Sequence, residues 1–227
     1  MIGVYNGAAY LREAIESVRS QTYRPFELIV VDDGSDDGSA EIAQAFEEVQ
    51  YIYQPRAGNG AARNRAVEAA TADFFAFLDA DDRFVPDKLE RQMNTLGADG
   101  GLDMVFGHVR EFVSPELGDE ERRAIRPPAP TPLPWTSPNL MLIRRASFER
   151  VGGFSTSLRV GVTVDWFARA SEAGLRSVVL PDVMLERRLH TENNGLRERD
   201  ARNQYLHVLK AAMDRRRAAG GTSNDRG

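Results

Sequence analysis

The stretch Phe74-Phe75-Ala76-Phe77-Leu78-Asp79-Ala80-Asp81-Asp82 places an unbroken apolar run directly before three aspartates. Such a run predicts a strand buried on both faces, because a strand with one exposed face alternates apolar and polar residues. Unpaired carboxylates cannot remain inside a dry sheet, so the strand has to reach the surface where the aspartates begin. Ligands of open α/β sheets bind beyond the carboxyl ends of strands, so we predict a site at this edge.

The aspartate cluster permits two interpretations. Hard oxygen ligands at a sheet edge suit Mg²⁺ or Mn²⁺, with the phosphates of a substrate completing the coordination. The alternative is an aspartate-rich loop that only caps the following helix, and the motif alone does not choose between them.

The composition restricts the class of protein. A chain of 227 residues can form one large α/β domain or two small ones. The net charge of −5 predicts that nucleic acid is not a partner. The absence of cysteine excludes disulfides and thiolate metal sites. No apolar run approaches the roughly 20 residues of a transmembrane segment and no signal peptide is evident, so we expect a cytoplasmic protein.

Predicted strands and helices alternate along the first half of the chain. The strands are expected at 1–5, 26–31, 51–53 and 74–78, and the helices at 8–20, 40–48 and 61–70. This order implies an α/β fold with a mainly parallel sheet and right-handed crossovers.

The second half is less regular. The proline-rich stretch 115–134 has little apolar surface and predicts a mobile surface loop. The remaining elements are expected at 87–96, 104–109, 140–143, 145–150, 164–173, 178–180 and 197–217, of which 104–109, 140–143 and 178–180 are strands.

Asp32-Asp33-Gly34-Ser35 follows the second predicted strand, as the first aspartate cluster follows its own. A carboxylate there could accept hydrogen bonds from a nucleotide base or ribose, or it could form an Asx-type turn. Two acidic clusters at strand ends repel each other, and a metal or ligand is the usual compensation.

Two further segments could bind an anion. The glycine-flanked helix start at 58–64 is a potential anion site, although it lacks the spacing of a P-loop and could be an ordinary turn. His190 follows the last predicted strand; a lone histidine is more often structural, but guanidinium groups such as those of Arg187 and Arg188 suit a diphosphate.

Several of these motifs together resemble family 2 glycosyltransferases, which are inverting enzymes of GT-A fold. The resemblance covers residues 1 to about 195. It is carried, in the order seen in that family, by Val4-Tyr5-Asn6-Gly7, Val31-Asp32-Asp33-Gly34-Ser35, Gly60-Ala61-Ala62-Arg63-Asn64, Phe77-Leu78-Asp79-Ala80-Asp81-Asp82, Pro86-Asp87-Lys88-Leu89 and Val151-Gly152-Gly153-Phe154.

The resemblance implies a site for a nucleotide-sugar donor. Asp33, with Asp32 beside it, would bind the uracil or thymine ring and the ribose, and Arg63 would belong to the same donor site. Asp79 and Asp81 resemble the family's DxD pair.

The resemblance also implies a metal and an acceptor side. Asp81, together with Asp79, would bind Mn²⁺ or Mg²⁺, and the metal would stabilise the leaving diphosphate. His190 resembles the histidine of an HxxN pattern near the diphosphate. The segment 135–141 corresponds to a wall that faces the acceptor.

Two departures from the family pattern bear on activity. The first strand is shortened at the N-terminus, where relatives have a fuller strand beside the nucleotide base. In addition, Val162 and Thr163 stand where relatives carry the Glu-Asp pair that includes the catalytic base. Asp165 matches the second aspartate of that motif and is the predicted base, with bracing of its helix as the alternative.

These observations predict a GT-A domain over 1–195, with a nucleotide-binding half at 1–110 and an acceptor half at 111–195. A C-terminal helix at 196–219 and a disordered tail at 220–227 would follow, and the helix offers a weak candidate for peripheral membrane contact. The predicted activity is inverting transfer from a UDP- or dTDP-sugar to a hydroxyl acceptor. The alternative is a degenerate relative that binds a nucleotide-sugar or a partner without turnover.

Overall fold

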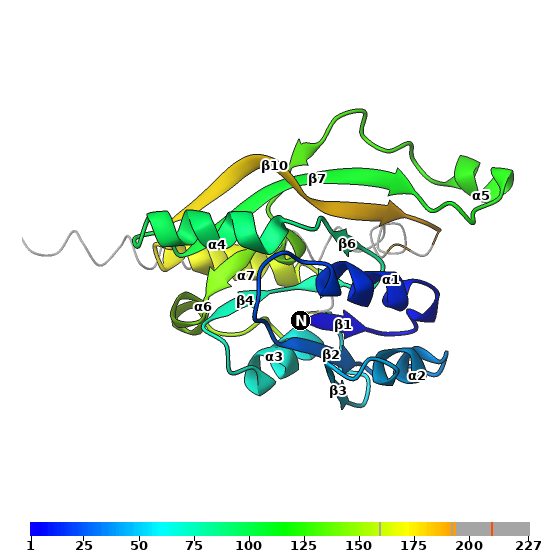
Figure 1. Ribbon diagram of the computed structural model, residues 1–227, viewed down its shortest axis with the longest axis horizontal. Helices are drawn as coiled ribbons and strands as arrows, with labels where there is room; N and C mark the ends of the chain where they lie inside the picture. Colours follow the sequence, from blue (N-terminus) through cyan, green and yellow to red (C-terminus); the bar gives the residue numbers. More distant parts are fainter. Residues whose placement is uncertain (159, 192, 194–209, 211–227) are drawn as a thin grey trace, which may run out of the picture.

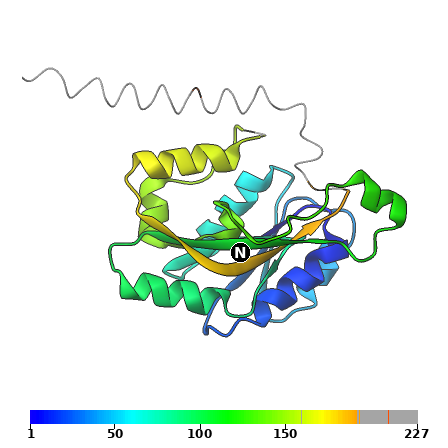
Figure 2. The ribbon, with the colours of Figure 1, turned by 90° about the horizontal axis from the view of Figure 1, so that it is seen from above.

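The computed structural model describes residues 1–158, 160–191, 193 and 210 (Figure 1). Two sheets form the centre of the molecule, and helices cover them on both sides. Viewed from above, α3, α6 and α7 lie on one side of the sheets, and α1 and α4 lie on the other (Figure 2).

The first sheet is entirely parallel, as the alternating pattern predicts. Its strand order is β3-β2-β1-β5. The strands are β1 (Ile2–Val4), β2 (Leu28–Asp32), β3 (Val49–Tyr53) and β5 (Leu78–Asp79), and the helices between them are α1 (Ala8–Arg19), α2 (Ser39–Gln44) and α3 (Asn59–Ala69). The short β1 lies in the middle of this sheet, so residues from both neighbouring strands end beside it.

The second sheet is mixed and has the order β4-β9-β7-β10-β6, with β8 paired to β7. Its long strands β7 and β10 run parallel to each other, and its other pairs are antiparallel. The strands are β4 (Phe74–Ala76), β6 (Arg83–Phe84), β7 (Met104–Val113), β8 (Leu133–Pro134), β9 (Leu142–Arg144) and β10 (Ser177–Leu189). The remaining helices are α4 (Lys88–Ala98), α5 (Asp119–Ala124), the 3₁₀ turn η1 (Pro138–Leu140), α6 (Arg145–Val151) and α7 (Val162–Glu172).

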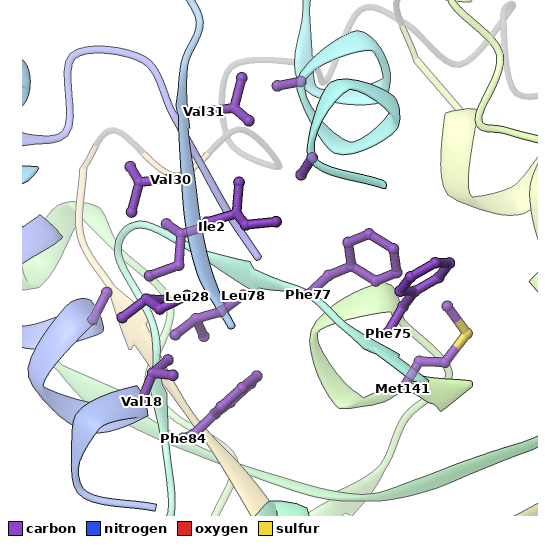
Figure 3. Packing of buried hydrophobic residues seen from close by; sticks show 14 of the residues in the cluster. Ile2, Val18, Leu28, Val30, Val31, Phe75, Phe77, Leu78, Phe84 and Met141 are labelled. Carbon is purple, nitrogen blue, oxygen red and sulfur yellow. The ribbon is translucent and has the colours of Figure 1, made fainter. Parts of the chain in front are cut away.

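The single strand predicted at 74–78 is in fact two strands in different sheets. β4 pairs with β9 in the mixed sheet, and β5 pairs with β1 in the parallel sheet. Phe77 lies between them and is buried, with its ring centroid 5.6 Å from that of Phe154 and 6.0 Å from that of Phe148 (Figure 3). An apolar run therefore marks burial here, but it does not show where the chain changes its pairing partner.

The proline-rich stretch is more ordered than the predicted mobile loop. It contains α5 and β8, and the Glu121 carboxylate accepts a hydrogen bond from the Gly118 N–H at the start of α5. Leu117 and Ile125 on either side of α5 are buried in a small cluster with Leu189. These two apolar residues supply the burial that the overall composition of the stretch did not suggest.

The last strand is also longer than predicted. β10 was expected only at 178–180, but it extends along β7 to Leu189. The predicted C-terminal helix and tail lie outside the described residues, apart from the helical Lys210.

A lysine is completely buried at the first residue of α4. Lys88 Nζ donates to Gln92 Oε1 at 2.7 Å and lies 4.2 Å from the centroid of the Phe84 ring. Burial disfavours the charged form and lowers the pKa of Lys88 to about 7. The Gln92 amide in turn donates to the carbonyl oxygens of Val105 and Leu140, so this pair joins α4 to β7 and to η1.

The buried lysine predicts a dependence of stability on pH. An unfolded lysine has a pKa of about 10.4, so between about pH 7 and pH 10 the unfolded chain binds more protons than the folded one. The free energy of unfolding should rise with pH in this window, by up to about 1.4 kcal/mol per unit from this group. Urea denaturation at several pH values should show that Lys88→Met loses this part of the dependence of the free energy of unfolding on pH. The substitution also removes the donor of Gln92 at every pH, so the test compares slopes and not absolute stabilities. Equal slopes in the two proteins would contradict the prediction.

Candidate active site

The two aspartate clusters reach the same edge of the parallel sheet. In the register of the sheet, Val4 of β1 is the partner of Asp32, and Gly3 is the partner of Asp79. Only β1 separates β2 from β5, so the backbones that carry the two clusters are about 10 Å apart. The structure thus brings together the residues that the sequence predicted at two separate strand ends.

Asp32 is directed into the fold. Its Oδ1 accepts from the Ser35 N–H at 2.8 Å, which closes the turn after β2, and its Oδ2 accepts from the Tyr51 hydroxyl at 2.8 Å. Burial, and then this hydrogen bond to a carboxylate, raise the pKa of Tyr51 to about 12. These contacts make Asp32 the residue that fixes the turn, on which the position of Asp33 depends.

Asp33 organises the loop that leads into α3. Its Oδ1 accepts from Gln54 Nε2 at 2.7 Å and from the Ala57 N–H at 2.8 Å, and its Oδ2 accepts from the Gly58 N–H at 2.8 Å. A carboxylate offers about four acceptor positions, so these three bonds leave one unused on a residue that is 4% exposed.

Asp79, Asp81 and Asp82 form a triad of carboxylates after β5. One oxygen from each lies within 4.8 Å of the others. The side chains of Asp79 and Asp81 are 35% and 31% exposed, whereas Asp82 is 4% exposed. Burial, followed by the charges of Asp81 and Asp79, raises the pKa of Asp82 well above its ordinary value.

Donors from α3 and η1 hold one side of the triad. Arg63 Nη2 donates to Asp79 Oδ1 at 2.8 Å. Asn139 Nδ2 donates to Asp79 Oδ2 at 2.7 Å and to Asp82 Oδ2 at 3.2 Å. The predicted donor-site residue Arg63 is therefore an ionic partner of the predicted metal ligand Asp79.

Donors at the end of β10 hold the other side. His190 Nε2 lies 3.0 Å from Asp81 Oδ2, and Asn193 Nδ2 donates to the same oxygen at 3.3 Å. The Asn193 side chain also accepts from the His190 N–H at 2.8 Å. The HxxN pattern is thus a local turn that presents both side chains to Asp81. The Arg188 N–H completes this side, donating to Asp82 Oδ1 at 3.0 Å.

The guanidinium groups of Arg187 and Arg188 are engaged within the fold. Arg188 is buried, and it donates to Glu13 Oε2 at 2.7 Å and to Ser114 Oγ at 3.0 Å. Arg187 Nη1 lies 3.4 Å from the buried carboxylate of Glu111. Their contribution to the site is to fix the end of β10 rather than to present two free cations.

The donor set of the triad fits a hard divalent cation. Carboxylate oxygens are the ligands that Mg²⁺ and Mn²⁺ prefer, and Asp79 and Asp81 are the two members that remain accessible. Asp82 is buried and accepts hydrogen bonds from Asn139 and from the Arg188 N–H, so it stabilises the loop that follows β5.

Asp165 lies in the first turn of α7 and is mostly buried. Its Oδ2 accepts from Arg169 Nε at 2.9 Å. Arg169 also donates to the carbonyl oxygens of Val151 and Gly153, both at 2.8 Å, so the pair ties α7 to the end of α6. This geometry is the helix bracing that sequence analysis weighed against a catalytic role, and the role as base stays a prediction.

The sequence analysis placed the segment 135–141 on the acceptor side but did not single out Asn139 as a partner of the triad. The only available signal was an amide residue beside the apolar run 140–143, which is common at strand ends. Glu13, the carboxylate partner of Arg188, also gave no signal, because it lies on α1 more than 170 positions away in the sequence.

With this fold and site, the comparisons assign the class of protein. The model of the family "Glycosyl transferase family 2" matches residues 1–160. The chain therefore belongs to glycosyl transferase family 2.

Similar proteins carry glycosyltransferase names. The chain is 32% identical to an uncharacterized glycosyltransferase of Rickettsia typhi over 179 residues. This alignment covers 74% of this chain and 56% of that protein. It is 39% identical over 108 residues to the uncharacterized glycosyltransferase YibD of Escherichia coli, covering 46% of this chain and 31% of YibD. The chain thus spans between about a third and just over half of these relatives.

Solved structures of S. aureus TarS share the fold. The TarS complex with UDP-GlcNAc matches with a TM-score of 0.72 at 18% identity, covering 93% of this chain and 64% of that chain. The complex with UDP matches with a TM-score of 0.67 at 19% identity, covering 83% and 59%. This likeness confirms the predicted GT-A fold. In the part of the chain that the structure describes, no helix combines the length and the apolar character needed to cross a membrane.

The bonds to Asp33 predict the effect of its neutralisation. In Asp33→Asn only one side-chain oxygen can accept, so the donors of Ala57 and Gly58 can no longer both be satisfied. The free energy of unfolding should fall by about 1–3 kcal/mol, and hydrogen exchange at these two amides should accelerate. Asp36→Asn, in the exposed part of the same turn, should change stability by less than about 0.5 kcal/mol. Equal effects of the two substitutions in urea denaturation would contradict this role of Asp33.

Proposed function

We propose that this chain transfers a glycosyl group from a UDP- or dTDP-sugar to a hydroxyl acceptor, with inversion at the anomeric carbon. The observation that carries the proposal is the carboxylate triad of Asp79, Asp81 and Asp82, which lies at the same sheet edge as Asp33. The TarS structures are complexes with UDP and with UDP-GlcNAc, which supports a uridine nucleotide as the donor.

The site residues would have different roles in donor binding. Asp33 has one acceptor position left for the base or ribose, beside a loop that it already holds rigid. Asp79 and Asp81 would hold Mn²⁺ or Mg²⁺, which when bound neutralises charge on the diphosphate. Arg63 and His190 keep these two carboxylates oriented and would lie beside the diphosphate.

The proposed reaction forms one bond and breaks one. The acceptor oxygen bonds to the anomeric carbon while the bond from that carbon to the diphosphate breaks on the opposite face. The electron pair leaves with the nucleoside diphosphate, and the acceptor proton has to pass to a base. Asp165 is the base that the family resemblance suggests, and it would have to exchange its bond to Arg169 for one to the acceptor.

A second candidate function is donor binding without turnover. Two observations favour it: Thr163 stands where the family carries an aspartate, and Asp165 is already paired with Arg169. The two candidates share the donor site and differ in whether a group on α7 can accept the proton.

Donor binding is tested by thermal melting with UDP, dTDP, GDP and ADP, each with and without Mn²⁺. A ligand at 100 times its dissociation constant stabilises by about 2.7 kcal/mol, or roughly 5–10 °C for a domain of this size. We expect this shift with UDP or dTDP only when Mn²⁺ is present. Asp81→Asn should abolish the metal-dependent shift, whereas Glu47→Gln, which removes an exposed carboxylate, should retain it. The donor proposal fails if the unsubstituted protein shows no shift with any pyrimidine nucleotide.

The role of Asp165 is tested by two substitutions that break the same ion pair. Asp165→Asn removes the carboxylate, whereas Arg169→Leu keeps it and removes its partner. If Asp165 is the base, Asp165→Asn should lower kcat by about 10²–10⁴-fold and Arg169→Leu should leave most of kcat. A purely bracing role predicts similar kcat values for both variants, with the larger loss of melting temperature in Arg169→Leu because Arg169 also bonds to Val151 and Gly153. Similar kcat values would remove Asp165 from the mechanism.

A further inference from the structure

The imidazole of His190 packs against an aromatic residue that lies outside the triad and its hydrogen-bond donors. The ring centroid of Tyr10, in the first turn of α1, is 4.9 Å from that of His190, and the two ring planes are inclined by 53°. Aromatic rings at such separations attract each other beyond the effect of burial alone. His190 is therefore held in two ways, by the Asp81 carboxylate 3.0 Å from its Nε2 and by the ring of Tyr10.

Tyr10 is in turn held by Arg188. The guanidinium carbon of this buried arginine lies 4.5 Å from the centroid of the Tyr10 ring and 4.8 Å from that of Phe112. A cation against an aromatic face is attracted most strongly where both are removed from water. Arg188 Nε also donates to the Asp81 carbonyl oxygen at 3.1 Å. A line of contacts thus runs from β7 through Arg188 and Tyr10 to His190.

The turn before α1 packs closely against the loop that carries the triad. The Tyr10 N–H donates to the Gly7 carbonyl oxygen at 3.0 Å, which fixes Tyr10 relative to this turn. A Cβ atom added to Gly7 would lie 2.8 Å from Val4 Cγ2 and 3.3 Å from Ala80 Cβ, so the turn already touches the triad loop. The start of α1 therefore has a fixed position beside the aspartates.

The hydroxyl group of Tyr10 holds the other end of the ring. Burial, and then the interaction of this hydroxyl with the Glu116 carboxylate, raise the pKa of Tyr10, so the hydroxyl stays neutral. Glu116 is itself fixed by Ser114, whose Oγ donates to Glu116 Oε1 at 2.5 Å and accepts from Arg188 Nη1 at 3.0 Å. The ring is thus held along its face and at its polar end.

We propose that Tyr10 is a positioning residue for donor binding, which holds the His190 imidazole in the orientation that meets Asp81. The inference deepens the proposed function and rests on it, because Asp81 is the proposed ligand of Mn²⁺ or Mg²⁺. Replacing a residue that bonds to a metal ligand typically weakens metal binding about 10–100-fold. The effect of Tyr10 would reach the metal through His190, without a contact of its own.

The alternative is that Tyr10 only fills space, as Leu11 and Ile15 do on the buried side of α1. Space filling affects the stability of the fold and leaves the affinity for a ligand unchanged. Ile15→Val, which removes one buried methyl group from the same helix, is therefore the matched control. It should lower the melting temperature without changing donor binding.

The orientation of His190 can be measured in the ligand-free protein. A carboxylate only accepts, so the contact with Asp81 places the hydrogen of the neutral imidazole on Nε2. Long-range ¹H–¹⁵N spectra, at an alkaline pH where unperturbed histidine is neutral, should show this tautomer in the unsubstituted protein and in Tyr10→Phe. Tyr10→Leu should show a mixture of both tautomers, and His190→Gln identifies the signal among the three histidines. A single tautomer retained in Tyr10→Leu would overturn the proposal.

Donor binding is measured as the dissociation constant of UDP in the presence of Mn²⁺. Tyr10→Leu should raise it about tenfold, whereas Tyr10→Phe, which keeps the ring, should stay close to the unsubstituted protein. In a His190→Gln background, Tyr10→Leu should have no further effect, because substitutions that act through one residue are not additive.

Additive losses in this double variant would overturn the proposal, since Tyr10 would then act independently of His190. If the unsubstituted protein does not bind UDP at all, the proposed function fails instead. The tautomer of His190 still decides the role of Tyr10 in that case, because it is read without a ligand.

Discussion

The mutual repulsion of three carboxylates at the end of β5 is the constraint on which the rest of the site depends. Asp79, Asp81 and Asp82 are within four residues of one another, and their oxygens lie within 4.8 Å. At that separation like charges raise the energy of the folded state unless donors surround them. The donors come from three segments far apart in the sequence: α3, η1 and the end of β10. These hydrogen bonds attach η1 and the end of β10 to the loop that follows β5.

The donors divide the triad into two parts with different chemistry. Asp82 accepts from a backbone N–H and from an amide, and burial raises its pKa, so it holds its loop without adding a third exposed charge. Asp79 and Asp81 are paired with Arg63 and His190, whose side chains are largely buried. In the proposed function, a cation bound by these two carboxylates would compete with both partners for their oxygens.

Local sequence patterns predicted the parallel sheet and the two aspartate clusters, because buried strands and their polar ends are encoded in contiguous residues. The division of 74–78 between two sheets was not predictable, since Phe75 and Phe77 are apolar in either arrangement. The order of 115–134 depends on Leu117 and Ile125, two residues in a stretch whose average composition is polar. The bonds of Asn139 to the triad were not predicted because they join residues more than 50 positions apart, and a single sequence carries no trace of such contacts.

The position of Asn139 itself depends on the buried lysine of α4. Lys88 Nζ fixes the oxygen of the Gln92 amide, which directs its nitrogen to the Leu140 carbonyl in the same 3₁₀ turn as Asn139. Two hydrogen bonds thus lead from the interior of α4 to the backbone of η1, next to the residue whose amide holds Asp79 and Asp82. Burial of an amine is costly, and a methionine of similar length would fill the same space without that cost. Lys88 instead fixes the orientation of Gln92, and through Gln92 it fixes the position of the turn beside the triad.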